Sequence, residues 1–406
     1  MKKIKPDVSF SPRLGISHPI TENSKLYFNY GHFKQMPEYE EIFRFGRDLS
    51  SGRVRNIGDP SLTQAKTVSY ELGYDQALFS MFLLQISAFY NDITNEQGYI
   101  NYSSDRLGIN YYEANNNNYR DIRGFEITLR KSEGDWFRGF VNYTYQDVTQ
   151  GTFGSQSINE SPSEQIKLDR NTQLLYQQKP KPQPWANVSL TFFTPHDLSP
   201  SLLVGDWSLN VLGTWRAGEY INYNPNMAPE YGSIIPNVQT TDYFNMDMRI
   251  NKTISISVLD ITFFVDIRNL LNNKRLSGAS FYDTHDEQYY LESLHLPSSS
   301  AYNNIPGDDK IGDVRKGGVP FQPIEQTVNV YSLSKRSIIP GTIYYDKVTK
   351  QYMEYDYTTN QWSEVDNSRM QKILDDKAYI DMPNNSSFDF LNPRQVFFGV
   401  TVSFKL

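Results

Sequence analysis

Apolar and polar residues alternate along the chain in about eleven separate segments, each of roughly ten residues. In the segment TVSYELGYDQ, Val68, Tyr70 and Leu72 fall on one face of an extended chain, and Glu71 and Asp75 fall on the other. Alternation with a period of two predicts strands that are buried on one side only. We therefore predict an all-β chain, because no segment of comparable strength has the helical period. The segments are RLGIS, KLYFNYG, TVSYELGYDQ, SMFLLQISAFYND, GFEITLR, FRGFVNYTYQ, ANVSLTF, WSLNVLGTW, FNMDMRIN, LDITFFVDIR and VFFGVTVSFKL.

The polar face of these predicted strands carries full charges, whereas the apolar face is nearly free of them. A soluble antiparallel sheet with one wet face also alternates, and for any single strand that is the simpler interpretation. Across the whole set, however, aromatic residues gather near the strand ends, where a bilayer places its interfacial girdles. We therefore predict a transmembrane antiparallel β-barrel. The charged residues predicted to face its lumen, where solvation is the simplest role for each, are Glu71, Asp75, Glu126, Arg130, Asp247, Arg249, Asp266 and Arg268.

The connections between the predicted strands alternate in length. Short links follow the odd-numbered strands, the last of them at TISISV, 253–258, and long links lie near 32–65, 92–120, 148–183, 219–241 and 271–394. Bacterial membrane barrels show this asymmetry, with short periplasmic turns and long extracellular loops. Such barrels have an even number of strands and start inside, yet the first strand here would run from the outside to the periplasm. We therefore expect this chain to be the C-terminal half of a larger barrel whose upstream strands are missing.

This reasoning divides the chain into three parts. Residues 1–270 are predicted to form barrel strands with extracellular loops, 271–394 a long extracellular insertion, and 395–406 the closing strand. The insertion is too long for a plain connection. Within it, GTIYYDKVTKQYMEYDYTTNQW alternates like a small hairpin meander, and DNSRMQKILDDKAY predicts a short helix. Tyr-rich loops make adaptable binding surfaces, so the candidate ligand contacts are Tyr344, Tyr345, Tyr352, Tyr355 and Trp362.

Composition narrows the class of protein further. The 406 residues include no cysteine, which excludes disulfides, thiolate metal sites and thiol nucleophiles. The formal net charge of −7 argues against nucleic-acid binding, which needs a basic face. No apolar run reaches about 18 residues, so a transmembrane helix is excluded, although strands that cross a membrane leave little trace in mean hydropathy. The start, MKKIKP, has no apolar signal-peptide segment behind it, so the chain is either cytoplasmic or lacks its true beginning.

Motifs for catalysis and metal binding are absent from the sequence. The five histidines are scattered without HExxH spacing, and neither a GxSxG elbow nor a Gly-rich phosphate loop occurs. The stretch PGDDKIGD, 306–313, invites a calcium interpretation, but it does not fit the EF-hand loop, and an acidic solvated turn is simpler. The sequence therefore predicts no enzyme, no catalytic or metal-ligating residue and no cofactor.

Three stretches carry a family resemblance. RNIGDPSLTQAKTVSYELGYDQ, 55–76, resembles the mid-barrel signature of TonB-dependent outer-membrane receptors, and DIRNLLNNK and VFFGVTVSFKL are similar to the family's last two strand endings. Several positions depart from the family's pattern: Asp59 replaces Asn, Gln64-Ala65 replaces Pro-Glu, Leu271 replaces Phe, and Leu406 replaces the terminal aromatic residue. The positions that match the first signature are Gly58, Pro60, Leu62, Thr67, Tyr70, Glu71 and Gly73.

The resemblance implies a function and a location. Members of this family are 22-stranded barrels of the Gram-negative outer membrane that take up a scarce, large nutrient with energy supplied through TonB. The nutrient would be a ferric siderophore, cobalamin, an oligosaccharide or a peptide. The implied partners are outer-membrane lipid, the TonB complex through a missing N-terminal part that includes the plug domain, and the unknown nutrient. The barrel would be monomeric. A surface lipoprotein would be a further candidate partner, and nucleic acid would not be a partner.

Two other classes of function stay open at this point. A passive porin or an adhesin would use the same kind of barrel without energy coupling. A barrel hydrolase would need converging Ser, His and acidic groups at one strand end, and the sequence does not assemble them. The discriminating observation between receptor and porin is the presence of a plug and a TonB box upstream of Met1.

Overall fold

The computed structural model describes residues 8–104, 106–175, 181–199, 203–221, 238–273, 285, 290, 312, 319, 322–376 and 393–404. The candidate calcium turn at 306–313 lies outside these residues except for Gly312. The chain divides into two compact units: the first holds residues 1–216, 249–264 and 399–406, and the second holds 217–248 and 265–398. Within the described ranges, no helix is both long and apolar enough to cross a membrane.

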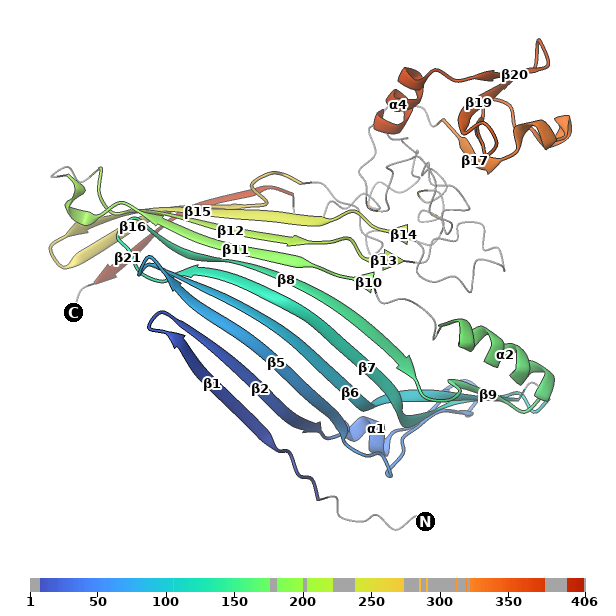
Figure 1. Ribbon diagram of the computed structural model, residues 1–406, viewed down its shortest axis with the longest axis horizontal. Helices are drawn as coiled ribbons and strands as arrows, with labels where there is room; N and C mark the ends of the chain where they lie inside the picture. Colours follow the sequence, from blue (N-terminus) through green and yellow to red (C-terminus); the bar gives the residue numbers. More distant parts are fainter. Residues whose placement is uncertain are drawn as a thin grey trace. The chain divides into compact units, whose positions relative to one another are not determined.

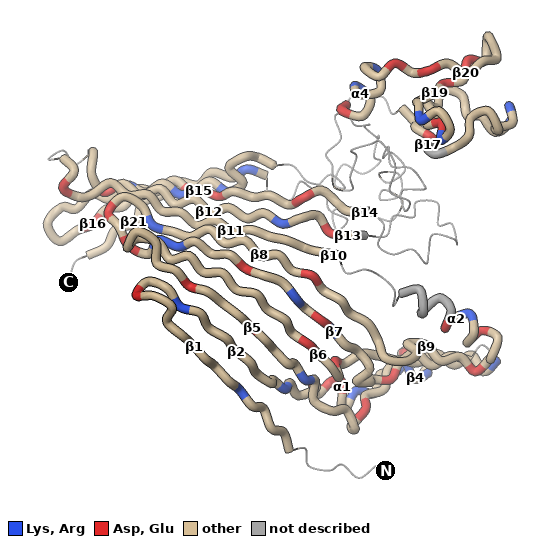
Figure 2. The backbone as a smooth tube through the Cα atoms, in the orientation of Figure 1, with Lys and Arg blue, Asp and Glu red and all other residues tan. Residues whose placement is uncertain are grey.

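One large, mostly antiparallel sheet dominates the part of the chain that the structure describes (Figure 1). Its main path follows the chain, because each strand pairs with the previous and the next one along it. Charged residues are scattered along these strands (Figure 2). The predicted all-β fold is therefore confirmed. The strands of this path are β1 (Arg13–Thr21), β2 (Ser24–Gln35), β5 (Ala65–Leu78), β6 (Phe82–Ser104), β7 (Ile109–Lys131), β8 (Phe137–Thr152), β11 (Trp185–Phe193), β12 (Trp207–Arg216), β15 (Tyr243–Ile256), β16 (Leu259–Arg268) and β21 (Gln395–Phe404).

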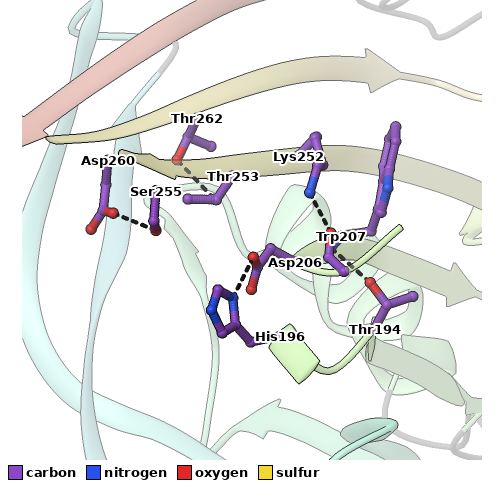
Figure 3. Close-up of polar contacts among 10 residues, drawn as sticks. Thr194, His196, Asp206, Trp207, Lys252, Thr253, Ser255, Asp260 and Thr262 are labelled. Carbon is purple, nitrogen blue, oxygen red and sulfur yellow. Dashed lines mark hydrogen bonds and ion pairs between the residues drawn. The ribbon is translucent and has the colours of Figure 1, made fainter. Parts of the chain in front are cut away.

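The turn after β15 is shorter than the sequence predicts. The sequence pattern predicts a link at 253–258, but β15 continues to Ile256 and leaves only two residues before β16. The cause is cross-strand hydrogen bonding: the hydroxyls of Thr253 and Thr262 lie 2.9 Å apart, and Ser255 donates to Asp260 at 2.6 Å (Figure 3). Polar residues that pair across a turn can therefore extend a strand beyond its apolar alternation.

The long link predicted at 92–120 is likewise mostly strand. β6 and β7 are each 23 residues long, and their pairing continues to Ser104 opposite Ile109. This hairpin extension was hidden because polar Asn, Gln and Ser residues occupy both of its faces, so no apolar period marks it. Short elements lie beside it and in the other long connections: α1 (Tyr39–Phe43), β3 (Phe45–Arg47), β4 (Val54–Ile57), β9 (Ser157–Asn159), α2 (Pro162–Leu175), β10 (Lys181–Pro182), η1 (His196–Leu198), β13 (Tyr220–Ile221) and β14 (Val238–Gln239).

Residues 322–376 of the second unit form a small sheet with its own helix. The sheet order is β17-β18-β19-β20, in which the first pair is parallel and the other two pairs are antiparallel. One side buries a cluster around Val330 and Tyr344, and the other side buries Ile343 against Met370 of the helix. We call this segment the small-sheet module. Its elements are β17 (Ile324–Val328), η5 (Val330–Ser332), η6 (Lys335–Ser337), β18 (Ile343–Asp346), β19 (Gln351–Asp356), β20 (Gln361–Glu364) and α4 (Asn367–Asp376).

Candidate functional site

Polar side chains from neighbouring strands of the first unit share one face of the large sheet. The register pairs Glu71 of β5 with Asn29 of β2, and Glu126 of β7 with Ser87 of β6 and Thr144 of β8. Paired residues, and residues two apart within a strand, point to the same side of a sheet. Because Ser87 is also paired with Gly73 of β5, Glu71 and Glu126 lie on the same face. We call this surface, centred on the two carboxylates, the polar face.

The Glu71 carboxylate is held by two donors from β2. The Tyr27 hydroxyl donates to Oε1 at 3.3 Å, and Asn29 Nδ2 donates to Oε2 at 3.1 Å. The Tyr27 ring reaches this position by lying across Gly73, where an added Cβ would stand 2.0 Å from the ring carbon Cζ. Glycine at 73 is thus needed for close approach, and an aromatic ring covers the gap that it leaves in the sheet.

Two further carboxylates on the polar face have different partners. Asp75 is largely buried, forms an ion pair with Lys25 at 3.1 Å and accepts a hydrogen bond from Gln85 at 3.3 Å. Among the residues that the structure describes, Glu126 accepts hydrogen bonds only from hydroxyls, those of Thr128 at 3.3 Å and Thr144 at 3.5 Å. Within the described residues, neither Glu71 nor Glu126 has a cationic partner. The polar face therefore carries two carboxylates whose negative charge no described residue neutralises.

The polar face is hollowed in two adjoining places. One hollow of about 450 Å³ lies over β1, β2 and β5, and the other of about 360 Å³ lies over β5, β6 and β7. Tyr27, Glu71 and Gln85 line both hollows, and Glu126 lines the second. The sequence predicts the carboxylates as site residues but does not single out Tyr27 or Gln85, although the alternation of their strands places both on the polar face. The hollows offer carboxylate, amide and hydroxyl groups to whatever occupies them.

Four of the other charged residues predicted to face a lumen have local partners. Arg130 lies over the ring of Phe140 at 5.7 Å, and Arg249 lies over the ring of Phe264 at 4.5 Å. Asp247 and Arg268 belong to the second unit, where Asp247 accepts from the Asn269 amide at 2.8 Å and Arg268 lies 5.4 Å from the ring centre of Phe397. Asp266 also falls in that unit. That these residues face a barrel lumen stays a prediction.

The turn between β11 and β12 is held by a second polar cluster (Figure 3). His196 Nδ1 lies 2.7 Å from a carboxylate oxygen of Asp206, which itself has a left-handed φ of 58°. The buried Lys252 donates to the carbonyl of Gly205, and the backbone N–H of Trp207 donates to Thr194 Oγ1 at 2.9 Å. These contacts fix the turn. Among the described residues, no group of three or more His, Cys, Asp or Glu could hold a metal ion.

The family described as "TonB dependent receptor-like, beta-barrel" matches residues 4–270, which is more than half of the chain and includes the polar face. The chain belongs to this family. Members of the TonB-dependent receptor family are outer-membrane proteins of Gram-negative bacteria. The predicted resemblance, which rested on the signature around Tyr70, Glu71 and Gly73, is therefore confirmed.

Several solved structures are also similar to the chain. The siderophore receptor PirA from Pseudomonas aeruginosa is 16% identical, with a TM-score of 0.40, 65% of this chain covered and 39% of that chain. The outer membrane transporter YddB from Escherichia coli is 14% identical, with a TM-score of 0.45 and coverages of 65% and 37%. The copper transporter OprC is 14% identical, with a TM-score of 0.39 and coverages of 65% and 34%. The chain thus spans between 34% and 39% of the length of these three structures. No curated protein matches it.

The five aromatic residues predicted as ligand contacts of this TonB-dependent receptor-like barrel lie in the small-sheet module. Tyr344 is only 2% exposed, and Tyr355 and Trp362 pack against the cluster around it. Tyr352 packs on the opposite side of the module, and its ring meets Tyr345 edge-on at 5.1 Å. Burial, and after it the neighbouring Tyr345, raises the pKa of Tyr352 to about 12. The structure therefore shows a packing role for these rings, and ligand contact by them stays a prediction.

A buried carboxylate holds the small-sheet module together. Asp346 is fully buried, and it accepts hydrogen bonds from the Val330 amide at 3.1 Å and from the Thr349 amide and hydroxyl at 2.8 Å. Burial alone would raise the pKa of Asp346, but the hydrogen bonds from Thr349 and Val330 outweigh it and lower the pKa. Because the folded pKa is lowered, this stabilisation is complete above the unfolded pKa and is lost as the pH falls through the folded value.

We expect the Asp346→Ala variant to destabilise the small-sheet module by about 1–3 kcal/mol, because it leaves the buried Val330 amide without an acceptor. Hydrogen exchange of the β18 and β19 amides in the whole chain measures this effect at neutral pH. The control is Asp356→Ala, which removes an exposed carboxylate at the end of β19 that bonds only the following turn, and it should leave exchange of the other β18 and β19 amides unchanged. Equal protection in Asp346→Ala and the parent protein would contradict the assigned role of the carboxylate.

Proposed function

We propose that this chain forms part of an outer-membrane transporter that imports a large nutrient with energy supplied through TonB. The family match over residues 4–270 carries the proposal. The sheet supports it, because neighbouring strands along the chain pair with each other and several are joined by short turns, as in membrane barrels (Figure 1). On this proposal the apolar face contacts lipid, and the long connections, including 271–394, lie outside the cell.

The polar face then lines the lumen of the barrel. A wide barrel leaves a lumen that its own side chains cannot fill, so a plug or water occupies it. Glu71 and Glu126 each accept hydrogen bonds from neutral groups, and no described cation neutralises either carboxylate. Charged groups held in a partly dry setting favour opposite charges nearby. We assign basic side chains of a plug domain as their partners in the complete receptor.

The proposal is tested by uptake into cells that carry the receptor, with and without TonB. Ferric siderophores, cobalamin, oligosaccharides and peptides are offered in turn, and we expect one class to accumulate only when TonB and a proton gradient are both present. A small antibiotic that crosses general porins serves as the control for membrane integrity. Equal accumulation in both strains would overturn the receptor proposal and favour a passive porin.

A further inference from the structure

Two lysines face each other at one end of the apolar face of the large sheet. Lys34 of β2 and Lys66 of β5 are directly opposite in the register, on the same side of the sheet as Tyr70 and Leu72. Like charges in this position repel each other and destabilise a sheet. Among the residues that the structure describes, neither lysine has an ion-pair partner. Water screens an exposed pair of this kind, so what binds it depends on where the membrane lies.

A row of tyrosines on the same face marks the edge of the membrane. Tyr30, Tyr70 and Tyr90 are consecutive partners in the register of β2, β5 and β6, and their ring centres lie 5.2 and 6.2 Å apart. The Tyr30 hydroxyl is also hydrogen-bonded to His32 Nε2. Tyrosines collect at the boundary between hydrocarbon and headgroups. On the proposed orientation, the row lies at this boundary and the lysines lie on its outer side.

The two lysines fall at the height of the lipid headgroups. Lys66 is four residues from Tyr70, which is about 13 Å along a strand at about 3.3 Å per residue. A strand tilt of about 40° reduces this to about 10 Å along the membrane normal. Headgroups extend about 5–8 Å beyond the hydrocarbon on each side, and the long stem of a lysine bends to bring its ammonium group to that level. Lipid phosphates are therefore within reach of both ammonium groups.

The position in the chain selects the outer leaflet. Lys34 lies in β2 just before the long connection 36–64, and Lys66 lies in β5 just after it. On the proposed function, the long connections lie outside the cell. In a Gram-negative outer membrane, the outer leaflet consists of a glycolipid, lipid A, that carries phosphate groups on its sugar rings. The pair therefore faces phosphate monoesters and not the diesters of ordinary phospholipids.

Acidic residues on the next strands confine the basic site to β2 and β5. Asp92 of β6 and Asp121 of β7 are directly opposite each other, and Asp121 accepts a hydrogen bond from Tyr90 at 3.3 Å. The nearby Arg123 is paired with Asp147 at 3.2 Å. A phosphate is repelled by the two aspartates and attracted by the lysine pair, so the charges of this face favour one place for it.

We propose that Lys34 and Lys66 bind a phosphate group of lipid A in the outer leaflet. A phosphate monoester carries a charge of about −1.5 to −2 at neutral pH, which matches the two lysines, and its three oxygens accept charge-assisted hydrogen bonds from both. Binding thereby replaces the repulsion between the lysines with two attractions. The inference rests on the proposed function for the orientation of the sheet, and it adds a lipid to the partners of the receptor.

The test is lipid binding by the purified, intact receptor in micelles of a neutral detergent, measured by native mass spectrometry. The probes are diphosphoryl lipid A, the same lipid A without its phosphates, and phosphatidylglycerol. We expect diphosphoryl lipid A to bind at least about tenfold more tightly than either of the others. The double variant Lys34→Gln/Lys66→Gln should lose this preference, because it removes both donors of the charge-assisted hydrogen bonds. It should still fold, because the change also removes a repulsion.

Matched variants separate phosphate binding from folding and from net charge. Lys34→Arg/Lys66→Arg keeps both charges and should keep the preference. Lys347→Gln/Lys350→Gln removes two exposed lysines from the turn between β18 and β19, and it should bind lipid A like the parent protein. The heat-dependent shift of the folded barrel on a gel checks the folding of every variant. If the double glutamine variant does not fold, Lys34→Gln and Lys66→Gln are compared singly, and each should weaken binding at least about threefold.

Three results would overturn the inference: equal binding of lipid A with and without its phosphates, undiminished binding in the glutamine variants, and displacement of lipid A by inorganic phosphate alone. Binding of phosphatidylglycerol as tight as that of diphosphoryl lipid A would also overturn it, because any anionic lipid would then suffice. TonB-dependent uptake without a phosphate preference would remove the inference and leave the proposed function standing. A phosphate preference with TonB-independent uptake would uphold the inference and remove the transport proposal.

Discussion

Replacing Ile127 by arginine lowers the stability of the receptor in a bilayer by about 2–4 kcal/mol. Ile127 lies on the face of the sheet opposite Glu126, between Phe125 and Leu129, and all three apolar side chains are partly exposed in the structure. On the proposed function this face contacts lipid, and the site lies near the middle of its apolar stripe. An arginine there must either lose its hydration in hydrocarbon or distort the strand to reach the headgroups.

The measurement is denaturant unfolding of the receptor folded into lipid vesicles, followed by tryptophan fluorescence. The control is Ser87→Arg, which places the same side chain on the polar face, beside the Glu126 with which Ser87 is paired. We expect this control to fold normally, because a carboxylate faces the new charge. If Ser87→Arg were the more damaging of the two, the two faces would be reversed and the register argument would fail.

Gly139→Ala is the second change with a large expected effect. Gly139 of β8 has a φ of +152°, and an added Cβ would stand 2.0 Å from the Ser189 carbonyl oxygen of the neighbouring β11. The clash is with backbone, which cannot swing aside as a flexible side chain would. Strained backbone and overpacking each cost about 1–3 kcal/mol, so we expect a loss of roughly 2–4 kcal/mol in unfolding free energy.

A glycine in the adjacent hairpin supplies the matched control. At Gly213 of β12 an added Cβ would meet only Val188 Cβ, at the ordinary contact distance of 3.6 Å. Gly213→Ala should therefore leave unfolding in vesicles unchanged within error, because alanine fits there without displacing a neighbour. A similar loss in both variants would mean that any side chain added to these strands is harmful and that the local geometry at Gly139 is not the cause.

Alternation is sufficient to predict the fold, because a sheet with one apolar face and one polar face has apolar and polar residues alternating along each strand. Where one face is apolar, as along 68–74, the strand could be identified and its faces assigned. Where both faces are polar, the pattern does not distinguish a strand from a loop, and it therefore predicts a loop over the outer halves of β6 and β7. The parallel pairing of β17 with β18 also has no local signal, because it joins segments separated by a structured connection.

The site was predictable only in part for a related reason. Charge on a strand identifies Glu71 and Glu126, since full charges are rare on barrel strands unless they face a lumen. Their neutral partners carry no such mark: Tyr27 is one of 29 tyrosines, and only the register places it over Gly73 and next to Glu71. The aromatic residues of the small-sheet module show the opposite case. Their abundance predicts a binding surface, but Tyr344 is buried in the core of the module.

The large sheet has almost no interior. Of the buried apolar residues in the described ranges, only Ala65 and Ala114 belong to its strands, and most of the others lie in the small-sheet module. If the apolar face lies in a membrane, acyl chains take the place that a packed core has in other proteins. A change in the length or saturation of the fatty acids then changes the stability of this protein, as a substitution in a packed core would, although the amino-acid sequence stays the same. Growth temperature, which adjusts those lipids, would thereby tune how firmly the receptor is held.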